Sequence, residues 1–182
     1  SFAQSTSSES KRSFEVARAT SLIDLDGVLD EAAWQSAAPM GDLIQRQPNP
    51  GTSPSEHTEV RLLHNDDFLY IGLVAFDSEP DQILATRMAR DSSIGANDRI
   101  EILLDTFQNQ RNAFYFATNP NGALIDGLAF GSQDLNTNWN AIWDLRTSRT
   151  DEGWIAKIAI PFKSLNFPAN SSTWGFNLSR TI

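Results

Sequence analysis

The sequence predicts an all-β fold, either a sandwich or a barrel, and three observations support this. Short stretches of alternating apolar and polar residues recur through the chain, as in strands that bury one face. Turn signals rich in Asn, Asp, Gly and Pro separate these stretches about every 8–12 residues, a spacing typical of sandwiches and barrels. Only one segment, residues 31–38, has a helical composition, so a doubly wound α/β sheet is disfavoured.

Short strands are expected along the whole chain. In order, they are predicted at residues 14–18, 41–47, 58–64, 68–77, 100–104, 114–116, 123–130, 142–150, 154–160 and 173–182. Residues 48–54 contain three prolines and are expected to form a loop, because proline cannot donate to a central β-ladder. Residues 80–87 carry the signal of one helical turn, and residues 131–140 are expected to form a polar loop.

The single helix is predicted at residues 31–38. Asp30 stands where an N-cap side chain accepts hydrogen bonds from the first helical turn. The Ala/Ala/Trp content places Trp34 against a sheet, and Pro39 ends the helix.

Residues 97–127 are expected to organise the fold as three strands joined by two turns. Ile100, Ile102 and Leu104 recur with a period of two, which indicates one buried face. Glu101 lies between the two isoleucines and must therefore point away from the core. The sequence thus predicts a carboxylate on the outer face of a central strand, where we expect the function.

Length and composition restrict the class of protein. The 182 residues suit a single domain with a sizeable core, and the absence of cysteine excludes disulfides and thiolate metal sites. A formal net charge of -9 opposes binding to nucleic acid or to anionic membrane surfaces. The longest apolar run, residues 68–76, is far shorter than the roughly 20 residues of a membrane helix, so direct membrane insertion is not expected.

The first residues suggest export. Ser1 and Ala3 are small residues spaced as in a signal-peptidase site, and an arbitrary boundary of the chain is the alternative. We expect residues 1–13 to be a flexible lead and residues 14–182 to form one domain.

Several segments, in the right order, resemble the family 9 carbohydrate-binding modules. The similar motifs are DG-x-L-D-E-x-x-W at residues 26–34, V-x-L and LY at residues 60–70, D-x-V-E-I-F-L-D at residues 98–105, and GW, IP and L at residues 153–165. The stretch IPFKSLNFP at residues 160–168 resembles the branch in which this module precedes a predicted outer-membrane barrel in Gram-negative bacteria.

The resemblance implies a jelly-roll-like antiparallel β-sandwich with one short N-terminal helix. It also implies an exported protein, periplasmic or associated with the outer membrane, with a further domain downstream in the same chain. The module would bind a mono- or oligosaccharide without catalysing a reaction, and would serve polysaccharide catabolism. Some members hold structural calcium, and no other cofactor is implied.

The chain departs from the sugar-binding members at several positions. The resemblance places an aromatic clamp tryptophan at Gly95, a sugar-gripping arginine near Ala117 and a glutamate at Lys157. The second clamp tryptophan would lie beyond Ile182, so the domain is expected to be truncated at its C-terminal end relative to the family. Of the sugar-contacting set, Glu101 carries over.

Glu101 is the first candidate for ligand contact. Its carboxylate could accept two hydroxyl hydrogen bonds from a sugar, each charge-assisted. The alternative is a solvated strand carboxylate that is paired with Arg99 or Arg111.

The second candidate is Trp139, in a polar loop between Asn138 and Asn140. Its ring could stack on sugar C–H groups while the two amides meet hydroxyls. The alternative is a loop anchor that lies under the sheet. By contrast, Trp143 and Trp154 lie in predicted strands and are expected in the core.

Catalytic and metal-binding patterns are weak. Asp98 and Glu101 are expected on opposite faces of a strand, and Glu101 and Asp105 would be about 13 Å apart, so neither pair suits a glycosidase. The spacing of His57 and His64 does not suit a shared metal ion.

Three aspartates, Asp24, Asp26 and Asp30, suggest a calcium loop at first sight. The segment lacks the glycine and the terminal glutamate of an EF-hand, and turn and helix-cap roles account for these side chains. No metal ligand is therefore assigned from the residues.

The leading hypothesis is a non-catalytic carbohydrate-binding module of an exported bacterial protein. The alternative is a structural or interaction β-sandwich of an outer-membrane protein that has lost sugar binding, as Gly95 and Ala117 suggest. A third hypothesis is a haem-binding relative, with Met40 or Met88 near one of the two histidines.

Overall fold

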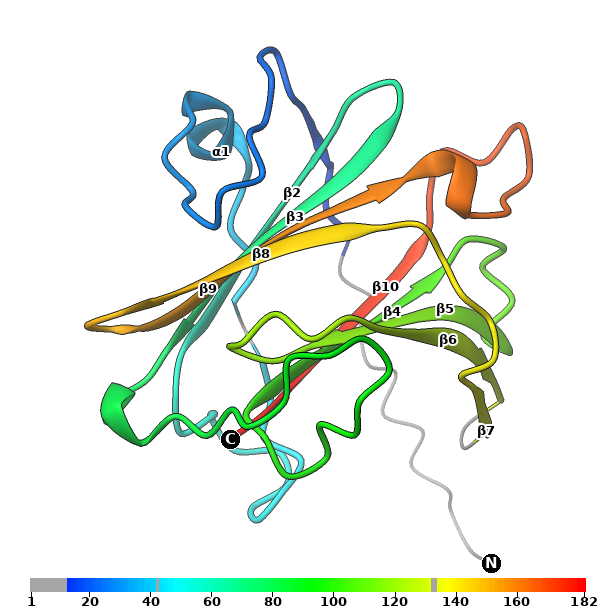
Figure 1. Ribbon diagram of the computed structural model, residues 1–182. Helices are drawn as coiled ribbons and strands as arrows, with labels where there is room; N and C mark the ends of the chain where they lie inside the picture. Colours follow the sequence, from blue (N-terminus) through cyan, green and yellow to red (C-terminus); the bar gives the residue numbers. More distant parts are fainter. Residues whose placement is uncertain (1–12, 42, 132–133) are drawn as a thin grey trace, which may run out of the picture.

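The computed structural model describes residues 13–41, 43–131 and 134–182, and these form two stacked β-sheets (Figure 1). We call them sheet A and sheet B. The fold is all-β and mainly antiparallel with one short helix, as predicted. No helix among the described residues is long and apolar enough to cross a membrane.

Sheet A has the strand order β1-β2-β3-β9-β8. Its strands are β1 (Ala17–Arg18), β2 (Thr58–His64), β3 (Phe68–Phe76), β9 (Gly153–Pro161) and β8 (Asp144–Thr150). The pair β1 and β2 is parallel, and the others are antiparallel.

Sheet B has the strand order β10-β4-β5-β6-β7 and is antiparallel throughout. Its strands are β10 (Gly175–Thr181), β4 (Arg99–Asp105), β5 (Asn112–Thr118), β6 (Ile125–Phe130) and β7 (Asp134–Asn136). Short 3₁₀ turns follow β3 at Pro80–Gln82 and β9 at Phe162–Ser164.

The core fills the space between the two sheets. On β4, Ile100, Ile102 and Leu104 are at most 2% exposed, whereas Glu101 and Leu103 between them are partly exposed. Sheet A contributes its own inward residues, including Trp154. The period-two pattern on β4 is therefore confirmed, and so is the core placement of Trp143 and Trp154.

Three predicted elements differ from the observed ones. No strand forms in the described part of residues 41–47, because Gln45 exchanges backbone hydrogen bonds with Thr52 and Gly51 and the chain turns back on itself. The predicted loop 131–140 contains β7. The helical turn at 80–87 shrinks to one 3₁₀ turn at Pro80–Gln82.

The helix α1 (Ala32–Ser36) is shorter than predicted, and the predicted cap at Asp30 is wrong. The N-cap residue is Glu31, which makes no side-chain cap hydrogen bond. The reason is that its carboxylate accepts hydrogen bonds from other groups, described below.

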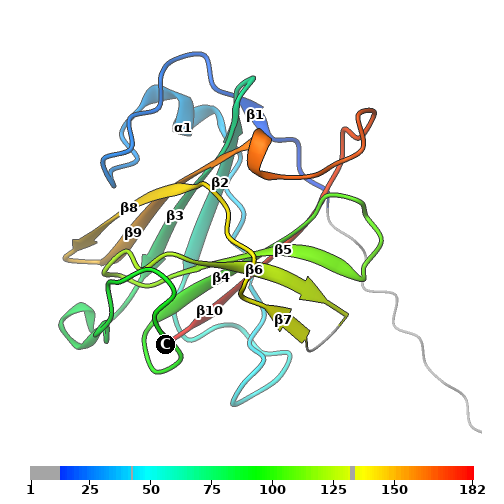
Figure 2. The same ribbon diagram turned by 45° about the vertical axis from the view of Figure 1, so that its right-hand side comes forward.

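Residues 23–37 form a third layer on the outer face of sheet A (Figures 1 and 2). Trp34, 1% exposed, packs there with Ala33, Leu63 and Tyr70. Gly72 on β3 makes room for this layer, because a Cβ atom there would lie 2.8 Å from side-chain atoms of Leu29 and Trp34. The centre of the outer face of sheet A is thus covered, while the outward side chains of Asp144 and Arg146 on β8 stay exposed.

Replacing Gly72 with alanine should lower the free energy of unfolding by about 1–3 kcal/mol, because the added methyl group overpacks the Trp34 contact. Urea unfolding followed by tryptophan fluorescence measures this loss. Gly95→Ala is the matched control, since a Cβ atom there meets nothing within 4 Å, and it should change stability by less than about 0.5 kcal/mol. Equal stability of the two variants would contradict this packing.

Candidate functional site

The outer face of sheet B presents Glu101 at its centre. The side chain is 30% exposed, and one carboxylate oxygen accepts a hydrogen bond from Tyr115 Oη at 2.8 Å. The other oxygen accepts one from Ser179 Oγ at 3.1 Å, and Arg99 Nε lies 3.5 Å from the oxygen that Tyr115 contacts. Three strands, β4, β5 and β10, therefore fix the orientation of this carboxylate and leave part of it open to solvent.

The electrostatics of this group keep Tyr115 neutral. Burial, the charge of Glu101 and the hydrogen bond to it all raise the pKa of Tyr115 above its ordinary value. The phenol therefore remains a donor to Glu101 at any physiological pH. Arg99 is held in place because its Nη1 also donates to the carbonyl oxygen of Gly95 at 2.8 Å.

A hollow of about 290 Å³ lies on the same face, one outward position further along β4, and Glu101 itself is not among its lining residues. Its floor includes Leu103, the next outward residue of β4, and Asn177, its register partner on β10. Gln110, Arg111 and Asn112 from the loop before β5 and the start of that strand add polar groups at its edge. The hollow is at the lower end of the roughly 300–1,000 Å³ that ligand pockets span, so it suits a small polar ring.

The loop before β5 is shaped by Asp105. Its carboxylate accepts hydrogen bonds from the backbone of Asn109 at 3.2 Å and of Gln110 at 2.7 Å. Gln108 and Gln110 adopt positive φ angles of 53° and 56°, which this pair of hydrogen bonds helps to hold. The polar edge of the hollow is therefore built by the end of β4 itself.

Trp139 lies on the other side of the sheet from Glu101. Its ring is 5.1 Å from that of Phe114 and 6.3 Å from that of Phe116, both inward residues of β5. It is partly buried against the core, in the position of a loop anchor. Asn138 and Asn140 flank it and are exposed. The structure therefore does not bring Trp139 and Glu101 together.

A buried carboxylate holds the chain that follows Trp139. Asp126 on β6 is fully buried and pairs with Arg90, with the backbone N–H of Ala141 and, at 3.2 Å, with Trp143 Nε1. This role of Asp126 was not predicted from the sequence. An acidic residue between apolar ones in a strand was the available signal.

Two positions at which the family resemblance implied sugar contacts are occupied by small residues here. Ala117, the register partner of Glu101, is 2% exposed and packs with Ile94 and Ala123. Gly95 is exposed and has open space around it. An arginine at Ala117 would have to displace this apolar cover.

Glu101 was predicted from the sequence, and so was Arg99 as one of its two alternative partners, but Tyr115 and Ser179 were not. Tyr115 could be placed on the outer face from its alternation with Phe114 and Phe116. Ser179 is 78 residues away from Glu101 and becomes a neighbour only through the pairing of β10 with β4.

Comparison with known families and structures gives one consistent result. A family model described as carbohydrate family 9 binding domain-like matches residues 25–181. No curated protein matches the chain.

Three solved structures share the fold. A family 9 carbohydrate-binding module from Caldicellulosiruptor kristjanssonii was solved with glucose (17% identity, 91% of this chain and 75% of that one, TM-score 0.62). The same module was also solved with cellotriose (17% identity, coverage 91% and 74%, TM-score 0.61). A candidate carbohydrate-binding protein from Bacteroides uniformis aligns at 11% identity over 91% of this chain and 81% of its own, with a TM-score of 0.68.

The two tyrosines of the chain provide a test of the Glu101 site. In an alkaline titration, Tyr115 should ionise at higher pH than Tyr70, whose pKa is raised less. Glu101→Gln should lower the pKa of Tyr115, because it removes the negative charge that opposes a tyrosinate, and should leave Tyr70 unchanged. Ultraviolet absorbance of tyrosinate measures both ionisation transitions, and circular dichroism shows that the fold is retained. The Tyr115→Phe variant identifies which transition belongs to Tyr70. An unchanged Tyr115 transition in Glu101→Gln would contradict this geometry.

Proposed function

This chain belongs to the carbohydrate family 9 binding domain-like family, and on that premise we propose that it binds a mono- or oligosaccharide on the outer face of sheet B. The family is one of non-catalytic binding domains, so the chain presents a recognition surface and no reacting groups. The single observation that supports the site is the partly exposed carboxylate of Glu101, which Tyr115 and Ser179 hold in place on the face that also carries a polar-edged hollow.

Glu101 is suited to sugar hydroxyls because its lone pairs are incompletely used. A carboxylate has about four acceptor positions, and hydrogen bonds from Tyr115 and Ser179 take two of them, while Arg99 lies 3.5 Å away as an ion-pair partner. A hydroxyl group that approaches from solvent can take a free position as a charge-assisted hydrogen bond. The neighbouring polar side chains of Asn177 and Arg111 then face other hydroxyls of a ring placed in the hollow.

Ligand contact by Trp139, Asn138 and Asn140 is a separate prediction. The exposed amides could contact a longer saccharide, but the indole is engaged with Phe114 and Phe116. We therefore assign orientation of the ligand to Glu101 and assign loop anchoring to Trp139.

Export and association with the outer membrane also remain proposals. Export rests on the spacing of Ser1 and Ala3, and the outer-membrane context rests on the likeness of residues 160–168 to the barrel-linked branch of the family. The role in polysaccharide catabolism has the same status.

Isothermal titration calorimetry against glucose, cellotriose and a panel of other glycans tests the proposal; glucose and cellotriose are the ligands named for two solved relatives. Glu101→Gln should weaken binding by about tenfold or more, because a charge-assisted hydrogen bond contributes about 1.5–3 kcal/mol. Glu59→Gln is the matched control: Glu59 is 29% exposed, is paired with Arg61 and lies on sheet A.

The control variant should bind like the original protein. Absence of heat with every glycan, or equal weakening by the two substitutions, would contradict the site. Absence of heat with every glycan would also support the alternative of an interaction domain that does not bind sugar.

Trp139→Phe separates the two candidate sites. The phenyl ring retains the packing against Phe114, so glycan affinity should stay within about twofold of the original value. The same calorimetric titration measures it. A loss of tenfold or more would instead locate the sugar at Trp139, Asn138 and Asn140.

A further inference from the structure

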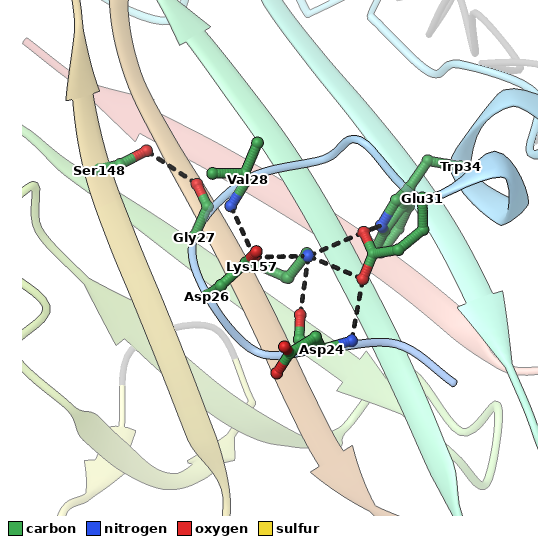
Figure 3. A network of polar contacts seen from close by, with 8 residues as sticks. All are labelled: Asp24, Asp26, Gly27, Val28, Glu31, Trp34, Ser148 and Lys157. Carbon is green, nitrogen blue, oxygen red and sulfur yellow. Dashed lines mark hydrogen bonds and ion pairs between the residues drawn. The ribbon is translucent and has the colours of Figure 1, made fainter. Parts of the chain in front are cut away.

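A fully buried lysine lies on the outer face of sheet A, beneath the N-terminal segment (Figure 3). The Nζ atom of Lys157 on β9 is 2.7 Å from the carbonyl oxygen of Asp24 and 2.8 Å from Asp26 Oδ1. It is also 2.9 Å and 2.8 Å from the two carboxylate oxygens of Glu31. Four oxygen atoms from one loop therefore surround one ammonium group.

Carboxylate and carbonyl oxygens are the ligands that calcium takes, at about 2.3–2.6 Å and with six to eight oxygens in total. The resemblance of the chain to the family 9 modules implied structural calcium in some members. In this chain the centre of the oxygen set is occupied by Lys157 Nζ, whose positive charge would repel a metal ion. No cluster of three or more His, Asp or Glu side chains suited to a metal occurs in the described part of the chain. The residues present here do not fit a calcium ion.

The same oxygen atoms fix the path of the N-terminal segment. Glu31 also accepts hydrogen bonds from the backbone N–H of Asp24 and from Trp34 Nε1, both at 2.9 Å. Asp26 accepts one from the backbone N–H of Val28 at 3.0 Å. The loop is thus folded around the ammonium group as a peptide loop folds around a metal ion.

The mutual interactions in this cluster favour the charged forms of Lys157, Glu31 and Asp26. Burial lowers the pKa of Lys157. The hydrogen bonds to Asp26 and Glu31 and the charges of these two carboxylates together have the larger effect, so the net direction is upward. Burial raises the pKa of Glu31, but the hydrogen bond from Lys157, the backbone hydrogen bonds and the charge of Lys157 together outweigh that effect, so the net direction is downward. The hydrogen bond from Lys157 also lowers the pKa of Asp26. Two carboxylates share one ammonium group, so removal of the lysine would leave them without a cation.

We propose that Lys157 is an internal cation that takes the place of a structural metal ion and holds the third layer on sheet A. The domain consequently folds and keeps this layer without any metal. Its oxygen set would accept a divalent cation once the ammonium group is removed.

Thermal unfolding with EDTA or with calcium chloride tests this inference. The midpoint of the unsubstituted protein should be the same in both buffers within about 1 °C, because the ammonium group already occupies the oxygen set. Lys157→Met should lower the midpoint in EDTA by about 6–20 °C, the loss expected when one partner of a buried ion pair is removed.

Calcium at about 100 times its Kd should restore roughly half of that loss in Lys157→Met. Lys163→Met is the matched control, since Lys163 is exposed and should show neither effect. If Lys157→Met does not fold in either buffer, Lys157→Glu replaces it, because it adds a carboxylate to the oxygen set.

Three outcomes would overturn the proposal. The first is stabilisation of the unsubstituted protein by calcium. The second is a Lys157→Met midpoint equal to that of Lys163→Met. The third is the absence of any stabilisation by calcium, either in a destabilised Lys157→Met or, where that variant does not fold, in Lys157→Glu. None of these readouts depends on sugar binding, so a failure here is distinguishable from a failure of the proposed function.

Discussion

The shared core between the two sheets is the constraint on which everything else depends. Since each strand gives every second side chain to that core, the remaining side chains are divided between two outer faces. On sheet A, the outer face is covered by residues 23–37 and includes Lys157, Gly72 and Trp34. On sheet B, no comparable layer of described residues covers Glu101 or Leu103. One sandwich thus presents a closed face, used for stability, and an open face, available for recognition.

Two glutamates show how this division acts on chemistry. Glu31 on the closed face accepts four hydrogen bonds, two from Lys157, one from Asp24 and one from Trp34, which saturate a carboxylate. Glu101 on the open face pairs mainly with two neutral hydroxyl groups and stays partly exposed. The first carboxylate has no capacity left for a ligand, whereas the second retains some. The same residue type therefore has a structural role on one sheet and a binding role in our proposal on the other.

The sequence predicted the strands whose pattern is set by the core, and it placed Glu101 on the outer face of β4. It also placed Trp34 against a sheet, as observed, but it did not reveal which polar groups are covered on each outer face, because that depends on distant segments. Lys157 and Glu31 are 126 residues apart, and in its strand Lys157 has the pattern of a solvated residue. Trp139 was ambiguous for a related reason: its polar neighbours suggested exposure, but Phe114 and Phe116 supply the apolar surface on which it packs.

Recognition on the open face must depend on hydrogen bonds more than on aromatic stacking. Gly95 and Ala117 supply no aromatic or cationic group. Among the outward residues of β4, β5 and β10, all of which the structure describes, Tyr115 is the one aromatic side chain, and its hydroxyl group donates to Glu101. A site built from positioned acceptors and donors rejects ligands that leave those groups unpaired far more strongly than an apolar platform does. At the proposed site, selectivity among sugars would therefore follow the orientation of individual hydroxyl groups relative to Glu101, and overall affinity would remain modest because little apolar area is buried.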